Sequence, residues 1–158
     1  MGVLYDYFRA PDGETALRLM DRDDIAPLSS AEGGLDTVEG NGVEPGVALS
    51  QALAFGLGVP WSVDLVDIAL VWPKTPYDEG GEEWESGVTV MRFSDEARDG
   101  FAHLADAALP EIADRWAGIE EFGGTAEPAH LLDWLTSLVG LARRAEKAGD
   151  GLFCWSCL

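Results

Sequence analysis

The sequence predicts an α+β fold, with α/β as the alternative, in which helices pack mainly on one face of one small mixed sheet. Three observations support this prediction. Apolar, strand-like segments stand at both ends of the chain, at residues 3–8 and 152–157. A further strand pattern occupies residues 87–93, and a long helical pattern occupies residues 128–148. At 158 residues the chain fits a single domain, residues 1–158.

The first part of the chain predicts a strand and a short helix. Residues 3–9 are rich in aromatic and β-branched side chains, and the turn-forming Pro11 and Gly13 follow them. Asp12 is placed to cap a helix over residues 14–20. Residues 21–46 are rich in turn-forming residues, and short extended pieces are expected there at 25–29 and 35–39.

Pro45 suits the first turn of the next helix, because proline lacks the N–H that would have no partner there. The expected apolar face of this helix consists of Val47, Leu49, Leu53, Ala54 and Leu57. Residues 61–72 fit a helix by the spacing of two acidic residues, but residues 68–72 also fit a buried strand. Both readings stay open at this stage.

The second half of the chain contains the clearest signals. Ser94 follows the strand at 87–93 and is placed to cap a helix. The expected buried stripe of that helix consists of Phe101, Leu104, Ala105 and Ala108. A shorter segment, residues 111–122, ends at paired glycines, and the long helix at 128–148 ends before Gly149. Because the first and last strands are both apolar enough to be central in the sheet, neither end of the chain is expected to be dispensable.

The charge of the chain excludes some partners and favours others. The chain carries 29 Asp and Glu against 10 Lys and Arg, which gives a formal net charge of -19. Nucleic-acid and membrane-surface binding depend on clustered basic residues, so we expect neither. Such a surface attracts a basic protein, although acidic residues also serve solubility alone. No export signal or membrane-spanning stretch is recognised, so a cytoplasmic location is expected.

The two ends of the chain resemble a known family. The residues concerned are Met1-Gly2 before a strand, a mid-chain Trp-containing segment, Ala148-Gly149-Asp150-Gly151 at the end of the long helix, and Leu152-Phe153-Cys154-Trp155. They resemble the YfbM-like family of small bacterial proteins. The resemblance implies a small α+β fold and assigns no activity and no site residues.

Two patterns could carry catalysis, and each has a simpler reading. Cys154 and Cys157 form a CxxC, but on a strand residues three apart face opposite sides, and two cysteines alone do not make a zinc site. His103 lies three residues before Asp106, and His130 three before Asp133, so each pair is expected to share a helix face. A carboxylate can orient an imidazole for acid–base chemistry, but a surface ion pair has the same spacing.

The strongest local candidate for a binding site is an acidic loop that contains a tryptophan. Trp84 stands among Asp78, Glu82, Glu83 and Glu85. Protein interfaces favour Trp as an anchor, and the surrounding charge assists encounter with a partner. The simpler reading is that Trp84 folds back onto the core while the acids stay in water.

The sequence therefore predicts a small acidic binding protein, of inhibitor or immunity type, for a basic protein partner. The alternative is a small enzyme or a small-molecule-binding domain that uses His103 and Asp106 or His130 and Asp133. No cofactor and no metal are expected, and the sequence does not specify an oligomeric state.

Overall fold

The computed structural model describes residues 2–18 and 35–158, which form strands, α-helices and short 3-10 helices. The strands are β1 (Leu4–Ala10), β2 (Thr37–Glu39), β3 (Ile68–Trp72), β4 (Val88–Phe93) and β5 (Gly151–Cys157). The α-helices are α1 (Gly13–Arg18), α2 (Val47–Leu57), α3 (Glu82–Glu85), α4 (Asp95–Ala102), α5 (Leu109–Trp116) and α6 (Pro128–Ala148). The 3-10 helices are η2 (Tyr77–Glu79), η3 (Asp106–Ala108) and η4 (Glu120–Phe122).

The five strands form one sheet in the order β2-β1-β5-β4-β3. As predicted, the first and last strands both lie inside the sheet, and β5 is its central strand. The prediction of a mixed sheet was wrong, because all four strand pairs are antiparallel. The fold is therefore α+β, and the α/β alternative, which needs parallel strands joined by crossover helices, does not apply.

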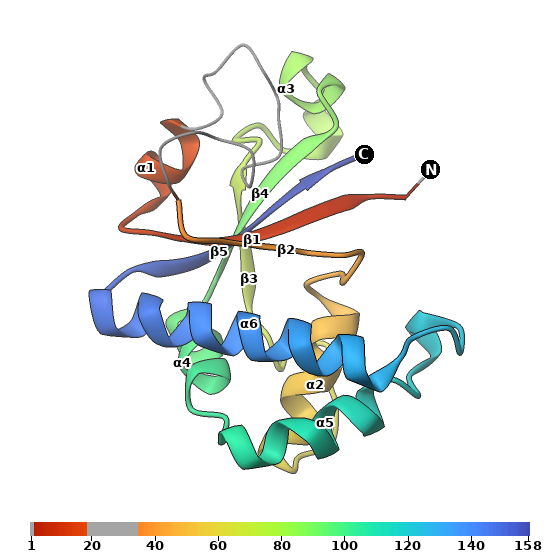
Figure 1. Cartoon of the computed structure of the whole chain (residues 1–158). Coiled ribbons are helices and arrows are strands. Elements are labelled where there is room, and N and C mark those ends of the chain that lie inside the picture. The colour runs from red at the N-terminus through yellow and green to blue at the C-terminus, as the bar shows by residue number, and fades with distance from the viewer. Residues whose placement is uncertain (1, 19–34) are drawn as a thin grey trace.

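The helices lie mainly on one face of the sheet, as predicted. Figure 1 shows α2, α4, α5 and α6 below the sheet and α1 on its other side. The larger apolar cluster lies between these four helices and the sheet and includes Tyr7, Phe101, Trp116 and Leu138. A smaller cluster covers the opposite face, where Phe8 stacks on Phe153 with ring centroids 5.3 Å apart.

The helix boundaries follow the capping signals in the sequence. The Ser94 hydroxyl accepts the N–H of Ala97 at 3.1 Å, and the Asp12 carboxylate accepts the N–H of Thr15 at 2.7 Å. Pro128 begins α6, and Gly149 ends it in the left-handed conformation that glycine adopts without strain, with φ of 73°. The predicted extended piece at 25–29, and residues 19–20 of the predicted first helix, lie outside the described residues.

Three expectations about the middle of the chain are corrected or decided. Leu49, Leu53 and Ala54 of α2 are buried as predicted, but Val47 and Leu57 are exposed, and Ala48 and Ala52 are buried instead. The predicted stripe after Ser94 breaks, because α4 ends at Ala102 and Ala105 is exposed. The ambiguous segment 61–72 contains the strand β3, which pairs with β4.

A chain of ion pairs joins β1, the residue before β2, and α6. The Arg9 guanidinium donates to the carboxylates of Asp36 at 2.8 Å and of Asp150 at 2.7 Å. The Arg144 guanidinium also donates to Asp36, at 2.6 and 3.0 Å. Hydrogen bonds from Arg144, which contributes more, and from Arg9 hold the pKa of the Asp36 carboxyl below its usual value of 3.8.

Asp36→Asn is expected to lower the free energy of unfolding by roughly 1 kcal/mol at neutral pH, a modest loss because the carboxylate is partly exposed and screened. A carboxyl with a lowered folded-state pKa stabilises the protein above its unfolded-state pKa, and this stabilisation is lost as the pH falls through the folded-state pKa. Urea titrations at about pH 7 and about pH 3 would measure the difference between wild type and variant, which should shrink at the lower pH.

Asp114→Asn makes the same charge change at an exposed position on α5 and serves as the control. It should leave the free energy of unfolding nearly unchanged at both pH values. A deficit of Asp36→Asn that persists undiminished at about pH 3 would contradict the electrostatic explanation.

Candidate functional site

The acidic loop between β3 and β4 folds back on itself through Glu83 and Trp84. The Glu83 carboxylate accepts the backbone N–H groups of Lys74 at 3.1 Å and Thr75 at 3.4 Å. The Trp84 indole N–H donates to the carbonyl oxygen of Thr75 at 2.8 Å. These bonds hold the short α3 against the segment that follows β3, so Glu83 has a structural task within the loop.

The other predicted site residues of this loop lie at its surface. Asp78 in η2 and Glu82 and Glu85 in α3 are all exposed. Trp84 is half-buried: its indole N–H points to Thr75, and part of its side chain is open to solvent. The structure thus keeps the acids in water, as the simpler reading expected, and places Trp84 at a boundary between loop and solvent.

Tyr77 is the residue of this loop that sequence reasoning missed. Its side chain is 78% exposed, and its ring meets Trp84 edge to face, with centroids 5.2 Å apart and an interplanar angle of 86°. An aromatic ring that follows a proline in an acidic loop was the available signal. We call the apolar surface formed by the Tyr77 and Trp84 rings together the aromatic wall.

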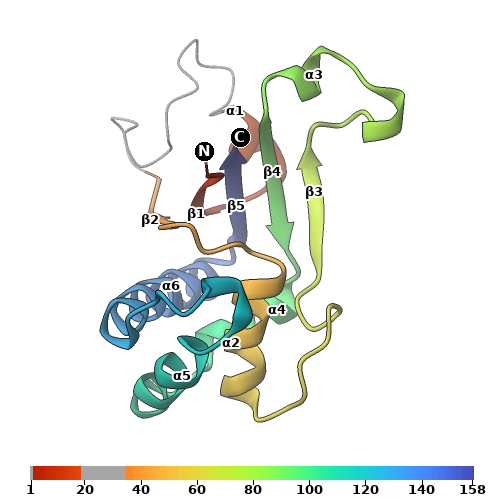
Figure 2. The same cartoon turned by 90° about the vertical axis from the view of Figure 1, so that its right-hand side faces the viewer.

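A pocket of about 520 Å³ lies beside this wall, on the face of the sheet that also packs the four helices. Its floor comes from neighbouring positions on three strands, because Tyr5 pairs with Ser156, and Ser156 pairs with Thr89. Met91, two residues along β4, adds an apolar surface. Figure 2 shows why this part of the sheet is open: the ends of β4 and β5 near the chain termini and α3 extend past the helices.

The floor of the pocket carries hydroxyl groups. The hydroxyl oxygens of Thr89 and Ser156 are 2.6 Å apart and share one hydrogen bond. Each hydroxyl can both donate and accept, so the pair keeps capacity for a bond to a ligand. Burial, and secondarily the charge of Glu44, raises the pKa of the Tyr5 phenol. Tyr5 therefore stays protonated near neutral pH and adds a further donor.

Glu44 supplies negative charge to the pocket. Its carboxylate accepts the N–H groups of Val47 at 2.6 Å and Ala48 at 3.2 Å, which fixes it at the start of α2. No Lys, Arg or His side chain is among the described residues that line the pocket. Glu83 and Glu85 flank Trp84 in the sequence. The site therefore combines aromatic surface, hydroxyl groups and negative charge.

The histidines lie beside carboxylates other than those expected. His103 lies 2.8 Å from the carboxylate of Glu146, and Asp106 is paired with Arg143 at 2.8 Å. The predicted pairing of His103 with Asp106 on one helix was wrong, because α4 ends at Ala102. Arg143 donates to the carbonyl oxygens of Ala102 and Leu104, at 2.9 and 2.6 Å, and so satisfies groups at the end of that helix.

His130 and Asp133 do share α6, as predicted, and both border an open hollow next to β2. The nearest carboxylate to the His130 ring is that of Glu127, with Nδ1 3.4 Å from the oxygen. His130 is largely exposed to solvent. This arrangement does not shield a reaction from water or orient the imidazole through Asp133.

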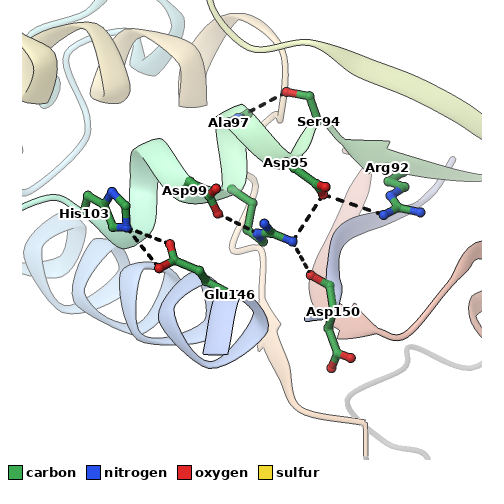
Figure 3. Close-up of polar contacts among 9 residues, drawn as sticks. Arg92, Ser94, Asp95, Ala97, Asp99, His103, Glu146 and Asp150 are labelled. Atoms are coloured by element: carbon green, nitrogen blue, oxygen red, sulfur yellow. Dashed lines mark hydrogen bonds and ion pairs between the residues drawn. The ribbon is translucent and has the colours of Figure 1, made fainter. Parts of the chain in front are cut away.

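A second group of charged side chains lies at the opposite end of β5 from the pocket (Figure 3). Arg98 on α4 donates to the Asp99 carboxylate at 2.8 Å and to the carbonyl oxygen of Asp150 at 2.7 Å. Its guanidinium also lies 3.2 Å from Asp95. Figure 3 shows the His103–Glu146 pair further along the same two helices. Arg98 thus pairs with two carboxylates of its own helix and holds α4 to the residue before β5 through a backbone carbonyl, so we interpret the group as structural.

The two cysteines lie on opposite faces of β5, as the strand geometry predicted. Cys154 belongs to the core on the helical side, and Cys157 packs against the cluster on the other face. Burial raises the pKa of the Cys154 thiol, which keeps it protonated and unreactive. Among residues 2–18 and 35–158, no three His, Cys, Asp or Glu side chains gather so as to hold a metal ion.

No helix within the described ranges combines the length and the apolar character needed to cross a membrane. Comparison of the chain with protein-family models, with curated proteins and with solved structures finds no match. The pocket beside Tyr77 and Trp84 is the basis of the function proposed for this chain.

Proposed function

We propose that the chain is a binding protein for a basic protein partner, and that a Lys or Arg side chain of this partner enters the pocket beside Tyr77 and Trp84. The observation that carries the proposal is that the Tyr77 and Trp84 rings and the carboxylate of Glu44 line one pocket, whose described lining residues include no basic side chain. Cations bind over aromatic faces, and the attraction grows when the cation is desolvated.

The chemistry of the pocket suits a long basic side chain. The apolar stem of Lys or Arg can lie against Met91 and Ile68, while its charged end meets the carboxylate of Glu44 and the hydroxyls of Thr89 and Ser156. Trp and Tyr are common anchors at protein interfaces, since they bury a large area with few rotatable bonds.

The net charge supports the same partner. At -19, the chain attracts a basic protein over distances longer than the contact itself and speeds its association. An inhibitor or immunity-type role agrees with such fast, charge-guided capture. The resemblance to the YfbM-like family adds no residue to this proposal and stays a prediction.

Capture from an extract of the native host would test the proposal. Wild type and a Tyr77→Ala/Trp84→Ala variant serve as baits, and bound proteins are identified by mass. We expect wild type to hold a basic protein at low salt and to release it at high salt, because screening shortens the reach of the charges. The variant should lose roughly tenfold or more of that protein, as is typical for interface anchors.

Leu57→Ala provides the matched control, since it removes an exposed apolar side chain at the far end of α2. It should capture the partner as wild type does. Equal capture by the pocket variant would contradict the proposal. In that case a His130→Ala variant in a ligand thermal-shift screen would test the small-molecule alternative, because His130 borders a separate hollow.

A further inference from the structure

The outer edge of β3 is a row of backbone groups that no other described strand of the chain pairs with. β3 is the last strand in the sheet order, with β4 on its inner side. The N–H of Ser94 donates to the carbonyl oxygen of Asp67, and Ala69 is paired with Arg92. Because hydrogen-bonding direction alternates along an antiparallel strand, the peptide groups of Ile68 and Leu70 point away from β4.

This edge has few of the sequence features that usually prevent a sheet edge from pairing with another strand. β3 reads Ile-Ala-Leu-Val-Trp, without a charge or a proline inside the strand. Leu70 is 48% exposed, and the strand is regular up to this residue, beyond which a bulge follows. Natural edges commonly carry Lys, Pro or inward-pointing charges, since an open apolar edge is a template for another strand.

The charge around the edge indicates what kind of strand fits it. Residues 59–87, which contain β3 and its flanks, include seven Asp and Glu and a single Lys, Lys74. Two copies of this chain would bring these acids together, and like charges across an interface are unfavourable. A basic segment instead meets opposite charge from the acidic residues that precede and follow β3 in the chain.

The edge is also continuous with the pocket, because Ile68 belongs to both. A strand laid along β3 points alternate side chains to the pocket side of the sheet. We propose that the partner is recognised through an extended segment with alternating Lys or Arg residues, which adds to the sheet at Ile68 and Leu70. This inference rests on the proposed function and names the conformation in which the partner binds. Strand addition gives affinity through backbone bonds and specificity through alternate side chains.

A synthetic peptide of alternating Lys and Val, seven residues long, is a suitable probe. Its affinity for the full chain is measured by titration calorimetry, beside that of the same peptide N-methylated on the backbone nitrogens of its lysines. In an antiparallel addition, the residues opposite Ile68 and Leu70 point their side chains to the pocket side and their N–H groups toward β3. Methylation removes backbone donors and should weaken binding by roughly tenfold or more, at about three- to tenfold per lost hydrogen bond. Amide hydrogen exchange at Ile68 and Leu70 should slow when the unmethylated peptide is bound, and this measurement needs no variant.

Leu70→Pro removes the outward N–H, and an edge strand tolerates proline where that group faces solvent. It should weaken binding roughly tenfold, whereas Leu70→Ala, which keeps the N–H, should stay within about threefold. Equal affinity for wild type and Leu70→Pro, or unchanged exchange at Ile68 and Leu70, would overturn the edge proposal. So would a wild-type dimer in sedimentation that Leu70→Pro dissociates, since a second copy would then occupy the edge.

A Tyr77→Ala variant separates this proposal from the one on which it rests. Peptide binding lost in Tyr77→Ala and kept in Leu70→Pro would leave the pocket standing and refute the edge. The reverse pattern would refute the pocket and support strand addition. Absence of peptide binding to the wild-type chain would refute the edge proposal, while the capture experiment would still decide on the pocket.

Discussion

A chain truncated before residue 153, which lacks the last six residues, is expected to be unfolded. These residues make up most of β5, the central strand, which pairs with β1 on one side and β4 on the other. Phe153, Cys154 and Trp155 are buried in the apolar clusters on both faces. Each large apolar side chain contributes roughly 1.5–3 kcal/mol when buried, and the backbone pairing of two strands is lost as well. A typical domain has only about 5–15 kcal/mol of stability to lose.

Far-UV circular dichroism and urea titration would measure this loss. The truncated chain should show no cooperative transition, whereas deletion of Leu158 alone should leave one, because that side chain is 86% exposed. A soluble truncated chain that unfolds cooperatively would show that the sheet can close without its central strand, contrary to the expectation.

Trp116→Ala is expected to cost roughly 3–5 kcal/mol of the free energy of unfolding, the usual range for a fully buried aromatic side chain. Trp116 on α5 has no exposed surface, and its ring packs edge to face on Phe122 and at a tilt against Trp134. Its indole N–H donates to the carbonyl oxygen of Ala48 at 2.8 Å, which joins α5 to α2. The substitution removes the packing that connects three helices and leaves a cavity between them.

Trp116→Phe separates packing from hydrogen bonding. It keeps most of the ring volume and removes the N–H donor, so the expected loss is smaller, about 1–2 kcal/mol. Thermal and urea unfolding followed by circular dichroism would rank wild type, Trp116→Phe and Trp116→Ala in that order of stability. A cost for Trp116→Ala below that of Trp116→Phe would contradict the packing explanation.

Local signals in the sequence predicted the elements whose ends are set by local chemistry. Pro128 and Gly149 marked both ends of α6, and Ser94 marked the start of α4 through its own hydroxyl. These residues act on backbone groups within one turn, so their effect does not depend on the rest of the fold. The same is true of the opposite orientation of Cys154 and Cys157, which follows from the period of a strand.

Predictions failed where a distant residue decided the outcome. The predicted apolar stripe after Ser94 continues in sequence through Ala108, but α4 ends at Ala102, where Arg143 of α6 donates to the carbonyl oxygens of Ala102 and Leu104. The inward face of α2 was predicted only in part, because apolar residues occur on more than one side of that helix. Packing against α5 and α4 buried Ala48 and Ala52 and left Val47 and Leu57 exposed.

The sequence by itself determined the fold class, the acidic charge and the position of both terminal strands inside the sheet. It also singled out Trp84 as a candidate binding residue. Only the tertiary structure decided the antiparallel sheet and the site, because strand register brings together residues that are far apart in the chain. Tyr5, Thr89 and Ser156 become neighbours on one floor through two strand pairings, and Tyr77 reaches Trp84 through the folding of its loop. Such contacts follow from long-range packing, which no local pattern encodes.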